Sequence, residues 1–306
     1  MTDVSRSATT TDLSSAATPL RERIGIVLAL FALYVIWGST YLGIRIGLEG
    51  FPPFLMSGIR FIIAGGALYA VLRSRGAEAP TRPQWIGAGI VGALLLVGGN
   101  GGVTFAEQWV ASGIAALGVA STPLWAALFA GLWGRWPVRL EWSGLLLGFA
   151  GVVLLNLEGD MRANPWGAAA LLLAAMSWAF GSIWSQRLSL PDGLMASAAQ
   201  MLVGGVILML LSLLTGERMT ALPGLRATGA LIYLIIFGSL IAFSAYGYLL
   251  RRVRPALATS YAYVNPIVAV GLGVGLANER IGVPGLVAMV VILVGVGLIA
   301  LVRQRT

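Results

Sequence analysis

Cysteine, histidine and lysine are all absent from this chain of 306 residues. Without cysteine and histidine there can be no disulfide bond, no thiol nucleophile, no imidazole acid–base catalyst and no metal site of the Cys/His type. Without lysine the G-x-x-x-x-G-K-[ST] loop that binds ATP phosphates cannot form. The sequence therefore predicts a protein with no metal and no cofactor, and not an ATP-driven pump.

Charged residues are also scarce. They make up 10% of the sequence, whereas a soluble domain carries about 25%. Hydrophobic residues reach 58% and the mean hydropathy is +0.87, so most of the surface is expected to face lipid. The 41 glycines suit helices that pack closely in a bilayer. Every acidic residue except Glu107 is expected in a loop or a tail, which leaves no carboxylate pair for an intramembrane enzyme.

Ten apolar runs follow a polar N-terminal segment, and each is close to the roughly 20 residues that cross a bilayer as a helix. Residues 1–23 are rich in Ser, Thr and Ala, and a disordered cytosolic tail is predicted there. The loops between the runs are too short for a soluble catalytic domain. The predicted spans are 24–46, 53–72, 83–104, 109–132, 141–157, 166–187, 194–215, 226–249, 256–277 and 283–302.

All 20 basic residues are arginines, and their distribution predicts the orientation of the chain. One side of the ten-span arrangement holds fourteen of them, the other side holds four, and Arg45 and Arg60 lie in or near spans. Loops rich in arginine stay in the cytoplasm. Both termini are therefore predicted to be cytoplasmic, in a multi-pass protein of the bacterial inner membrane whose arginines report orientation and not nucleic-acid binding. The four arginines of the far side are Arg162, Arg218, Arg226 and Arg280.

Three short patterns occur twice in the same order, which indicates an internal duplication. The two copies of each pattern are separated by 139 to 143 residues. Five spans per copy is an odd number, so the second copy must enter the membrane from the opposite face. The sequence thus predicts an all-α membrane protein of ten transmembrane helices in two inverted five-helix repeats, residues 24–157 and 166–302, as in many alternating-access transporters. The repeated patterns are Leu55–Met56 with Gly65–Gly66 and Leu194–Met195 with Gly204–Gly205, then Trp37–Ser39 and Trp178–Ser182, then Pro123 and Pro266.

Five stretches of the sequence resemble the EamA-type exporters of the drug/metabolite transporter superfamily. The resemblance covers nearly the whole chain from about residue 25 to residue 302. Within the superfamily the chain is similar to the bacterial branch that includes the aromatic amino-acid exporter YddG. This resemblance implies ten helices in two inverted EamA-like repeats, a central cavity, and export of amino acids or similar metabolites. The stretches are WGSTYLGIRIG (37–47), MSGIRFIIAGG (56–66), NPWGA (164–168), SWAFGSI (177–183) and PALATSYAYVNPIVAV (255–270).

Two pairs of residues are the first candidates for substrate binding, because a cavity for an amphiphilic solute needs aromatic walls and a few polar anchors. Trp37 and Tyr41 are four residues apart and share a helix face. Trp178 and Ser182 have the same spacing in the second repeat, and we expect the two faces to meet across the cavity. The alternative is that these aromatic residues anchor the chain at the membrane interface. The depth of Trp37, roughly 20 Å along its span, favours the cavity.

Four more residues are predicted to contact the substrate. Asn100 stands in the sequence GGNGG, where glycines allow a break in the helix. Its amide must find a partner when it is buried, and a substrate group or a neighbouring helix could supply one. Tyr246, Tyr263 and Asn265 are the polar candidates of the later spans.

Two charges and two prolines are candidates for charge recognition or gating. Arg60 lies well inside a span, where a charge is costly unless it is functional or paired, so it could hold a carboxylate of the substrate or of Glu107, or snorkel toward the interface. Glu107 is expected at the external mouth. Pro123 and Pro266 are predicted to kink their spans at paired positions, either as flexing points for alternating access or as purely structural kinks.

These features together predict a membrane transporter that exports small amphiphilic metabolites, above all aromatic and other neutral amino acids. Since the spans lack acidic residues, facilitated diffusion through an alternating-access cavity is expected. The alternatives are a proton-coupled efflux carrier for drugs or cationic compounds, a channel and, more remotely, an intramembrane enzyme. Glycines of spans 141–157 and 283–302 could pack against a second subunit or inside the bundle, so a monomer or a weak homodimer is expected.

Overall fold

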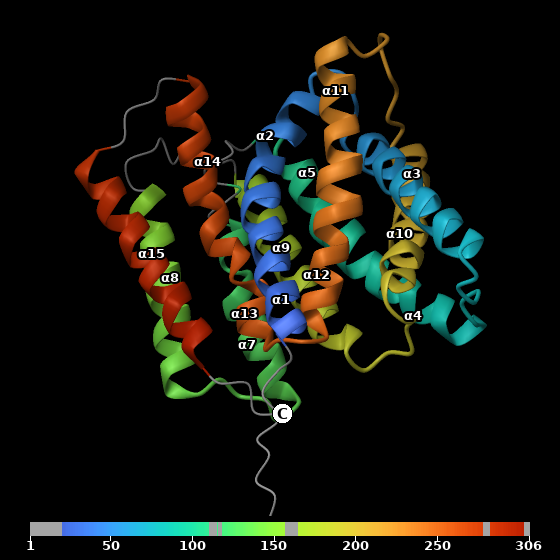
Figure 1. Ribbon diagram of the computed structural model, residues 1–306. Coiled ribbons are helices and arrows are strands. Elements are labelled where there is room, and N and C mark those ends of the chain that lie inside the picture. The colour runs from blue at the N-terminus through green and yellow to red at the C-terminus, as the bar shows by residue number, and fades with distance from the viewer. Residues whose placement is uncertain (1–19, 110–114, 116–117, 157–164, 278–281, 303–306) are drawn as a thin grey trace, which may run out of the picture.

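The computed structural model describes residues 20–109, 115, 118–156, 165–277 and 282–302. Within these ranges every regular element is helical and none is a strand. The helices stand side by side in one bundle (Figure 1), as the sequence predicts for an all-α membrane protein. The helices are α1 (Leu20–Ala32), η1 (Leu33–Trp37), α2 (Gly38–Gly47), α3 (Pro53–Ser74), α4 (Arg82–Gly92), η2 (Ala93–Gly101), α5 (Gly102–Ala106), α7 (Thr122–Leu132), α8 (Arg139–Asn156), α9 (Pro165–Ser185), α10 (Leu194–Leu214), α11 (Leu225–Tyr233), η3 (Leu234–Ile241), α12 (Ala242–Leu250), α13 (Pro255–Thr259), α14 (Tyr261–Ala277) and α15 (Val283–Leu301).

Six of the described helices are long and apolar enough to cross a membrane, and two shorter apolar helices accompany them. Each coincides with a predicted span, although part of the predicted span 109–132 lies outside the described residues. Their outward side chains are Leu, Ile, Val and Phe, which suit contact with lipid. The six are Leu20–Gly47, Pro53–Ser74, Arg82–Ala106, Leu194–Leu214, Leu225–Leu250 and Val283–Leu301, and the shorter two are Gly118–Leu132 and Ala169–Ser185.

The N-terminal tail predicted over residues 1–23 ends earlier than expected, because α1 begins at Leu20. Residues 1–19 of that tail lie outside the described residues. The first turn of α1 holds Glu22, which lies 3.6 Å from Arg252 at the end of α12. A carboxylate suits a helix N-terminus, and its pairing with Arg252 extends the helix beyond its apolar part. The start of α1 and the end of α15 lie at the same end of the bundle (Figure 1).

Two helices that hold equivalent places in the two halves, α3 and α10, pack against each other along their length. Glycine makes this approach close enough for backbone contact. A Cβ at Gly65 would lie 2.7 Å from the backbone nitrogen of Leu202, and one at Gly205 would lie 2.8 Å from the nitrogen of Ile62. The repeated glycine pairs of the sequence therefore mark the surface where the two halves meet.

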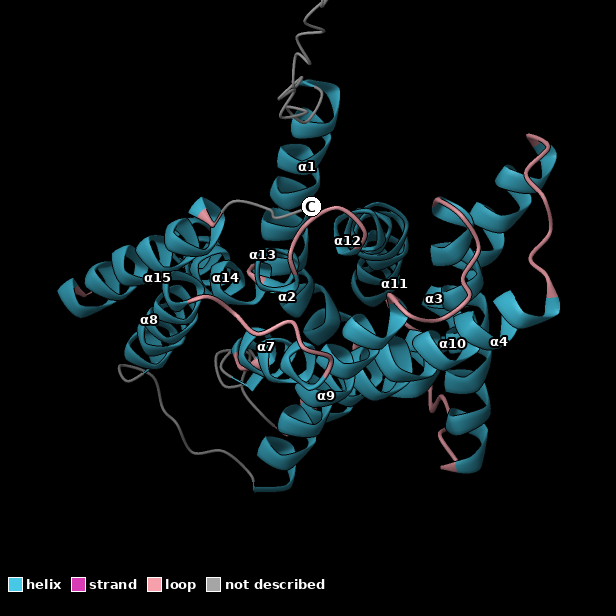
Figure 2. Ribbon diagram, turned by 90° about the horizontal axis from the view of Figure 1, so that it is seen from below, coloured by secondary structure: helices cyan, strands magenta, loops and turns pink. Residues whose placement is uncertain are grey.

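The last helices of the two halves, α8 and α15, form the second such pair. A Cβ at Gly144 would lie 2.7 Å from the carbonyl oxygen of Gly295, and one at Gly295 would lie 2.6 Å from the nitrogen of Gly148. These glycines are thus used inside the chain and not on a surface free for a second subunit. Viewed from below (Figure 2), α8 and α15 stand on one side of the bundle, α3, α4 and α10 on the other, and α2, α9 and α12 between them.

Three stretches adopt π-helical geometry, and two of them hold equivalent positions in the halves. The stretch η2 begins at Ala93 and η3 at Leu234, a separation of 234 − 93 = 141 residues that matches the separation of the sequence patterns. The helix break predicted around Asn100 is therefore a widened helix and not an interruption. Because π-helical turns are rare and concentrate at functional sites, their paired occurrence directs attention to the space between them.

A buried ion pair corrects the expectation that acidic residues other than Glu107 lie in loops or tails. Glu141 lies in the first turn of α8 with 3% of its side chain exposed. Arg254 donates to its carboxylate through Nε at 2.9 Å and through Nη2 at 2.5 Å. A carboxylate can be buried here because the bidentate guanidinium neutralises it. The pair joins α8 to the start of α13.

Candidate substrate cavity

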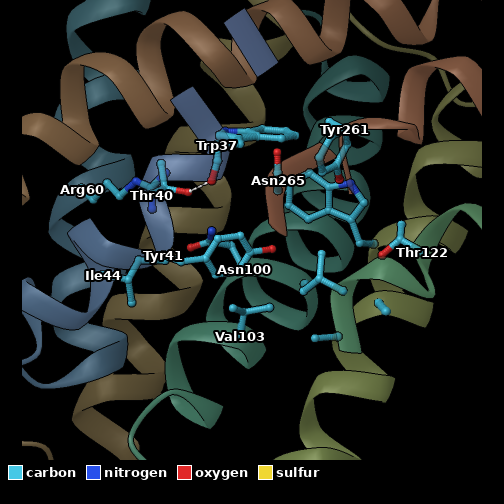
Figure 3. Close-up of a pocket in the computed structure, with 15 residues that line it drawn as sticks. Trp37, Thr40, Tyr41, Ile44, Arg60, Asn100, Val103, Thr122, Tyr261 and Asn265 are labelled. Atoms are coloured by element: carbon cyan, nitrogen blue, oxygen red, sulfur yellow. Dashed lines mark hydrogen bonds between the residues drawn. The ribbon is translucent and has the colours of Figure 1, made fainter. Parts of the chain in front are cut away.

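A cavity lies in the middle of the bundle, between helices of both halves (Figure 3). It leaves about 70 Å³ for molecules the size of water. Its lining combines aromatic rings, five polar or charged side chains of which four are buried, and small residues. The lining residues are Trp37, Thr40, Tyr41, Ile44, Arg60, Gly99, Asn100, Val103, Val119, Thr122, Ala174, Ala175, Trp178, Tyr261 and Asn265.

One face of the first helix supplies a quarter of this lining. Trp37, Thr40, Tyr41 and Ile44 follow one another at the spacing i, i+3, i+4 and i+7, which places them on a single face. All four are buried. The predicted pair Trp37 and Tyr41 therefore lies in the cavity and not at a membrane interface.

Four aromatic rings close one end of the cavity. Trp37 is central: its ring centroid lies 5.4 Å from that of Trp178, 5.3 Å from that of Tyr246 and 4.6 Å from that of Tyr261. Most of these contacts are edge-to-face, the geometry that the ring quadrupoles favour. The predicted faces of the two halves thus meet through Trp37 and Trp178.

Hydrogen bonds fix the rings of this cluster. The indole nitrogen of Trp178 donates to the hydroxyl of Tyr246 at 3.0 Å, and Ser182 lies 2.6 Å from the same hydroxyl. The indole nitrogen of Trp37 donates to the carbonyl oxygen of Gly238 in η3 at 3.1 Å. These bonds satisfy polar groups that would otherwise be costly inside the bundle. We call Trp37, Trp178, Tyr246 and Tyr261 the aromatic barrier.

The aromatic barrier separates the central cavity from a second hollow. Tyr246 is fully buried and lines a cavity of about 510 Å³ together with Gln200 and Arg251. The other three rings of the barrier line the central cavity. Arg251 is one of the fourteen arginines on the predicted cytoplasmic side of the spans. The second hollow therefore lies on the side that the sequence assigns to the cytoplasm.

Two amide oxygens in the central cavity have no hydrogen-bond partner. They are Oδ1 of Asn100 in η2 and Oδ1 of Asn265 in α14. Asn265 is 2% exposed; its side chain interacts with the Tyr41 hydroxyl, while its Oδ1 has no hydrogen-bond partner. Buried acceptors are rarely left without a donor, so each can receive a hydrogen bond from a molecule that enters the cavity.

Arg60 projects into the cavity from α3 beside Thr40 (Figure 3). Its Nε donates to the hydroxyl of Ser239 in η3 at 2.7 Å, and its guanidinium carbon lies 4.8 Å from the ring centroid of Phe61. None of the ion pairs among the described residues involves Arg60, so the pairing with Glu107 considered from the sequence is not formed. A guanidinium without a counter-ion therefore faces the cavity.

Glu107 lies just beyond the apolar helix that ends at Ala106, at the opposite end of the cavity from the aromatic barrier. It lines a hollow of about 1030 Å³ together with Arg45 and Glu217, which we call the outer vestibule. Both carboxylate oxygens are buried without a hydrogen-bond partner. Burial raises the pKa of Glu107 well above its usual range, although the charge of Arg45 acts in the opposite direction.

Several predicted residues lie outside the cavity. The hydroxyl of Tyr263 donates to the carbonyl oxygen of Leu145 in α8 at 2.9 Å, because its position on α14 turns it away from the cavity. Ser182 and Tyr246 lie behind the cavity wall and position Trp178. Pro123 lies in the first turn of α7, directly after a turn at Ser121 that interrupts the apolar helix Gly118–Leu132.

Pro266 lies inside α14 as predicted, next to the cavity residue Asn265. The backbone turn on this side occurs at Ser260, between α13 and α14. Each half therefore has a turn that precedes its proline, at Ser121 and at Ser260.

Tyr261 is the aromatic cavity residue that the sequence reasoning missed, and Thr40 and Thr122 are further lining residues that it did not name. Tyr261 is buried in the aromatic barrier, whereas the predicted Tyr263 is not. The signal was present, because Tyr261 and Asn265 are four residues apart and share a helix face. Tyr263 lies halfway between them and must point to another side.

Comparison with known proteins identifies the chain. The sequence profile of the EamA-like transporter family matches residues 23–157 and again residues 165–301. The chain belongs to the EamA-like transporter family. This EamA-like transporter is 50% identical over 282 residues to the uncharacterized inner membrane transporter YedA of Escherichia coli (strain K12), with 92% of each chain covered. It is therefore a multi-pass protein of the inner membrane.

More distant similarities of the EamA-like transporter extend to plants and to solved structures. It is 27% identical to the WAT1-related protein At3g02690, chloroplastic, of Arabidopsis thaliana, with 88% of this chain and 68% of the plant chain covered. It also superimposes on a protein known from its crystal structure with a TM-score of 0.75 and 24% identity, covering 92% of this chain and 99% of the other. At that identity the likeness establishes the fold alone.

Proposed function

We propose that this EamA-like transporter exports small amphiphilic metabolites, above all aromatic and other neutral amino acids, by alternating access through the central cavity. The observation that carries the proposal is the cavity lining. Trp37, Trp178 and Tyr261 offer an aromatic wall, while Asn100 and Asn265 offer amide oxygens that await donors. An amphiphilic solute has the apolar body and the polar groups that these two kinds of surface bind.

The proposal includes the membrane topology. The two ranges that match the EamA-like profile would be two inverted repeats of five spans, residues 24–157 and 166–302, with both termini in the cytoplasm. The helix pairs α3–α10 and α8–α15 support it, since each pairs equivalent helices of the two halves. The grouping of Arg251, Arg252 and Arg254 with the start of α1 supports the placement of the termini.

The size of the cavity supports a carrier that changes shape. Pockets that hold small ligands measure about 300–1,000 Å³, and the central cavity leaves about 70 Å³ for molecules the size of water. A solute with an aromatic ring can enter only when the walls separate. The larger hollows on either side, of about 1030 Å³ and 510 Å³, provide a route toward each face of the membrane.

The test is flux in liposomes that contain the purified protein. Uptake of labelled tryptophan, phenylalanine, threonine and a cationic dye is followed with and without a pH gradient, for the wild type and for Trp37→Ala. We expect saturable aromatic amino-acid flux that is accelerated by substrate on the far side, needs no gradient and falls at least tenfold in the variant. Flux of the dye that depends on the gradient, without movement of any amino acid, would disprove the proposal.

A second candidate function, proton-coupled efflux of cations, rests on Glu107 alone. Its buried carboxylate has no hydrogen-bond partner and stands between the central cavity and the outer vestibule. With a raised pKa, the carboxyl holds its proton while it is sealed and loses it when the vestibule admits water. If this function holds, Glu107→Gln abolishes the dependence of flux on the pH gradient. Under facilitated diffusion, flux is the same with and without the gradient in both the wild type and Glu107→Gln.

A further inference from the structure

The guanidinium of Arg60 has hydrogen-bonding capacity and charge that the protein does not use. Arg60 is 3% exposed and lies in the middle of α3. A guanidinium offers five N–H donors, and one of them, on Nε, reaches a protein acceptor, the hydroxyl of Ser239. An arginine held only for stability at this depth would be expected to have a carboxylate or several carbonyl partners.

No neighbouring acid neutralises this charge. The ion pairs among the described residues join Arg226 with Glu49, Arg252 with Glu22 and Arg254 with Glu141. Glu107, the acidic residue nearest in the chain to the cavity lining, has Arg45 as its charged neighbour and not Arg60. The cavity therefore carries a net positive charge where Arg60 enters it. Such a charge attracts anionic groups and opposes cations, and it does so strongly in a space with little water.

Two amide oxygens of the cavity need hydrogen-bond donors, whereas Arg60 needs acceptors. Oδ1 of Asn100 and Oδ1 of Asn265 are acceptors without donors. Figure 3 shows both side chains in the cavity together with Arg60, which enters beside Thr40. An ammonium group supplies donors and a favourable charge for amide oxygens. The cavity thus presents a donor site for an anion, an acceptor site for a cation and an aromatic wall.

Resting on the proposed function, we propose that Arg60 binds the carboxylate of the substrate, that Asn100 and Asn265 bind its ammonium group, and that the transporter therefore selects zwitterions over amphiphilic cations. Arg60 is then the residue that determines specificity for the charge of the substrate. Its bond to Ser239 orients the guanidinium by holding Nε; Nη2 lies against Gly238, and no hydrogen bond among the described residues uses either terminal nitrogen. An aromatic amine without a carboxylate leaves Arg60 without a counter-ion, and its ammonium group is repelled by the guanidinium.

The first experiment changes the substrate and leaves the protein intact. Phenylalanine, phenylethylamine and phenylpropionate share one ring, but the amine lacks the carboxylate and the acid lacks the ammonium group. Each is tested as a competitor of labelled phenylalanine in liposomes and as a stabiliser of the purified protein in detergent, since a ligand of the folded state raises its melting temperature. For the wild type we expect phenylethylamine to bind roughly 10- to 100-fold more weakly than phenylalanine, as the loss of one charged hydrogen-bonded contact implies.

The second experiment changes the protein. Arg60→Gln should weaken phenylalanine binding roughly 10- to 100-fold and leave phenylethylamine binding unchanged or improved, so the preference disappears. Arg60→Lys keeps the charge without the planar fork and should restore part of the preference. Asn265→Leu should weaken phenylalanine binding and spare phenylpropionate. Arg226→Gln, which removes an exposed arginine remote from the cavity, is the matched control.

The outcomes separate this proposal from the proposed function. If amino acids move but Arg60→Gln retains the wild-type ratio of phenylalanine to phenylethylamine, the role of Arg60 is disproved and the exporter function stands. If phenylalanine neither moves nor binds while phenylpropionate stabilises the wild type and not Arg60→Gln, the amino-acid function fails and Arg60 remains an anion-binding residue. If none of the three compounds stabilises the wild type, both proposals fail.

Discussion

The paired helices at the sides of the bundle and the walls of the central cavity are built by opposite rules. In the pairs α3–α10 and α8–α15, glycines bring backbones into direct contact. Among the described residues, none of the buried polar side-chain atoms that lack a partner lies on these four helices. Around the cavity, Arg60, Asn100 and Asn265 keep charge and hydrogen-bonding capacity unused. Close packing with paired polar groups distinguishes the helix pairs of the scaffold. Polar groups without protein partners distinguish the cavity, where another molecule can pair with them.

The same contrast distinguishes the charged residues. Glu141 is buried, and the partly buried Arg254 pairs with it in a bidentate contact that needs nothing from outside the chain. Arg60, equally buried, has a serine hydroxyl as its protein partner. A buried charge by itself therefore does not indicate a transport site, whereas a buried charge without a counter-ion makes its cavity a candidate for one.

The largest expected effect comes from breaking the buried ion pair of the scaffold. Arg254→Ala leaves the buried carboxylate of Glu141 without its partner and should lower the free energy of unfolding by about 3–5 kcal/mol. Glu49→Ala is the control, because Glu49 and Arg226 form an exposed pair at 3.7 Å, and such pairs contribute about 0.2–1 kcal/mol. Denaturant unfolding in detergent measures both. Equal losses in the two variants would show that burial of Glu141 has no energetic consequence.

Two adjacent glycines of α3 offer a sharper test of the scaffold. A Cβ at Gly65 meets the backbone of α10 at 2.7 Å, whereas a Cβ at Gly66 comes no closer than 3.8 Å to the side chain of Leu202. Gly65→Ala should therefore destabilise the protein by about 1–3 kcal/mol through overpacking. Gly66→Ala should be neutral or stabilise it by up to about 1 kcal/mol through helix propensity. Melting temperatures of the purified variants test both expectations. A loss of stability in Gly66→Ala equal to that in Gly65→Ala would show that Gly65 is not the point of close contact between α3 and α10.

The smallest expected effects come from two tyrosine hydroxyls, and they separate cavity from scaffold. Tyr246→Phe removes the acceptor of the Trp178 indole nitrogen, which should raise the KM for aromatic amino acids several-fold. Tyr263→Phe removes a bond to a carbonyl oxygen of α8 and should cost about 0.5–1.5 kcal/mol of stability with KM unchanged. Flux assays and melting curves on the same preparations give both values. An unchanged KM in Tyr246→Phe would remove the aromatic barrier from the transport path.

Much of the scaffold could be predicted from the sequence. Within the described residues the predicted spans coincide with helices, and the repeated glycines mark the contact between α3 and α10. These features depend on hydrophobic length and on the absence of a side chain, which a sequence displays directly. Trp37 and Trp178 could be predicted to meet because one pattern recurs in both halves.

The rest depended on geometry that spacing does not display. The choice between Tyr261 and Tyr263 required the orientation of α14 about its axis, which packing against α8 determines. The burial of Glu141 depended on Arg254, which lies 113 residues away in the chain. The absence of a counter-ion for Arg60 among the described residues could be established only once its neighbours were known.

The π-helical stretch η2 has a mechanical consequence for the cavity. A π-helical turn bonds residue i to residue i+5, so it accommodates an extra residue within a helix that is otherwise α-helical. Each residue of an α-helix turns the axis by about 100°. If the extra residue of η2 passes into an adjoining turn, Asn100 swings to another direction while almost every backbone hydrogen bond is kept. A shift of the π-helical turn along η2 would therefore rotate the Asn100 side chain toward or away from the solute without unfolding the helix that carries it.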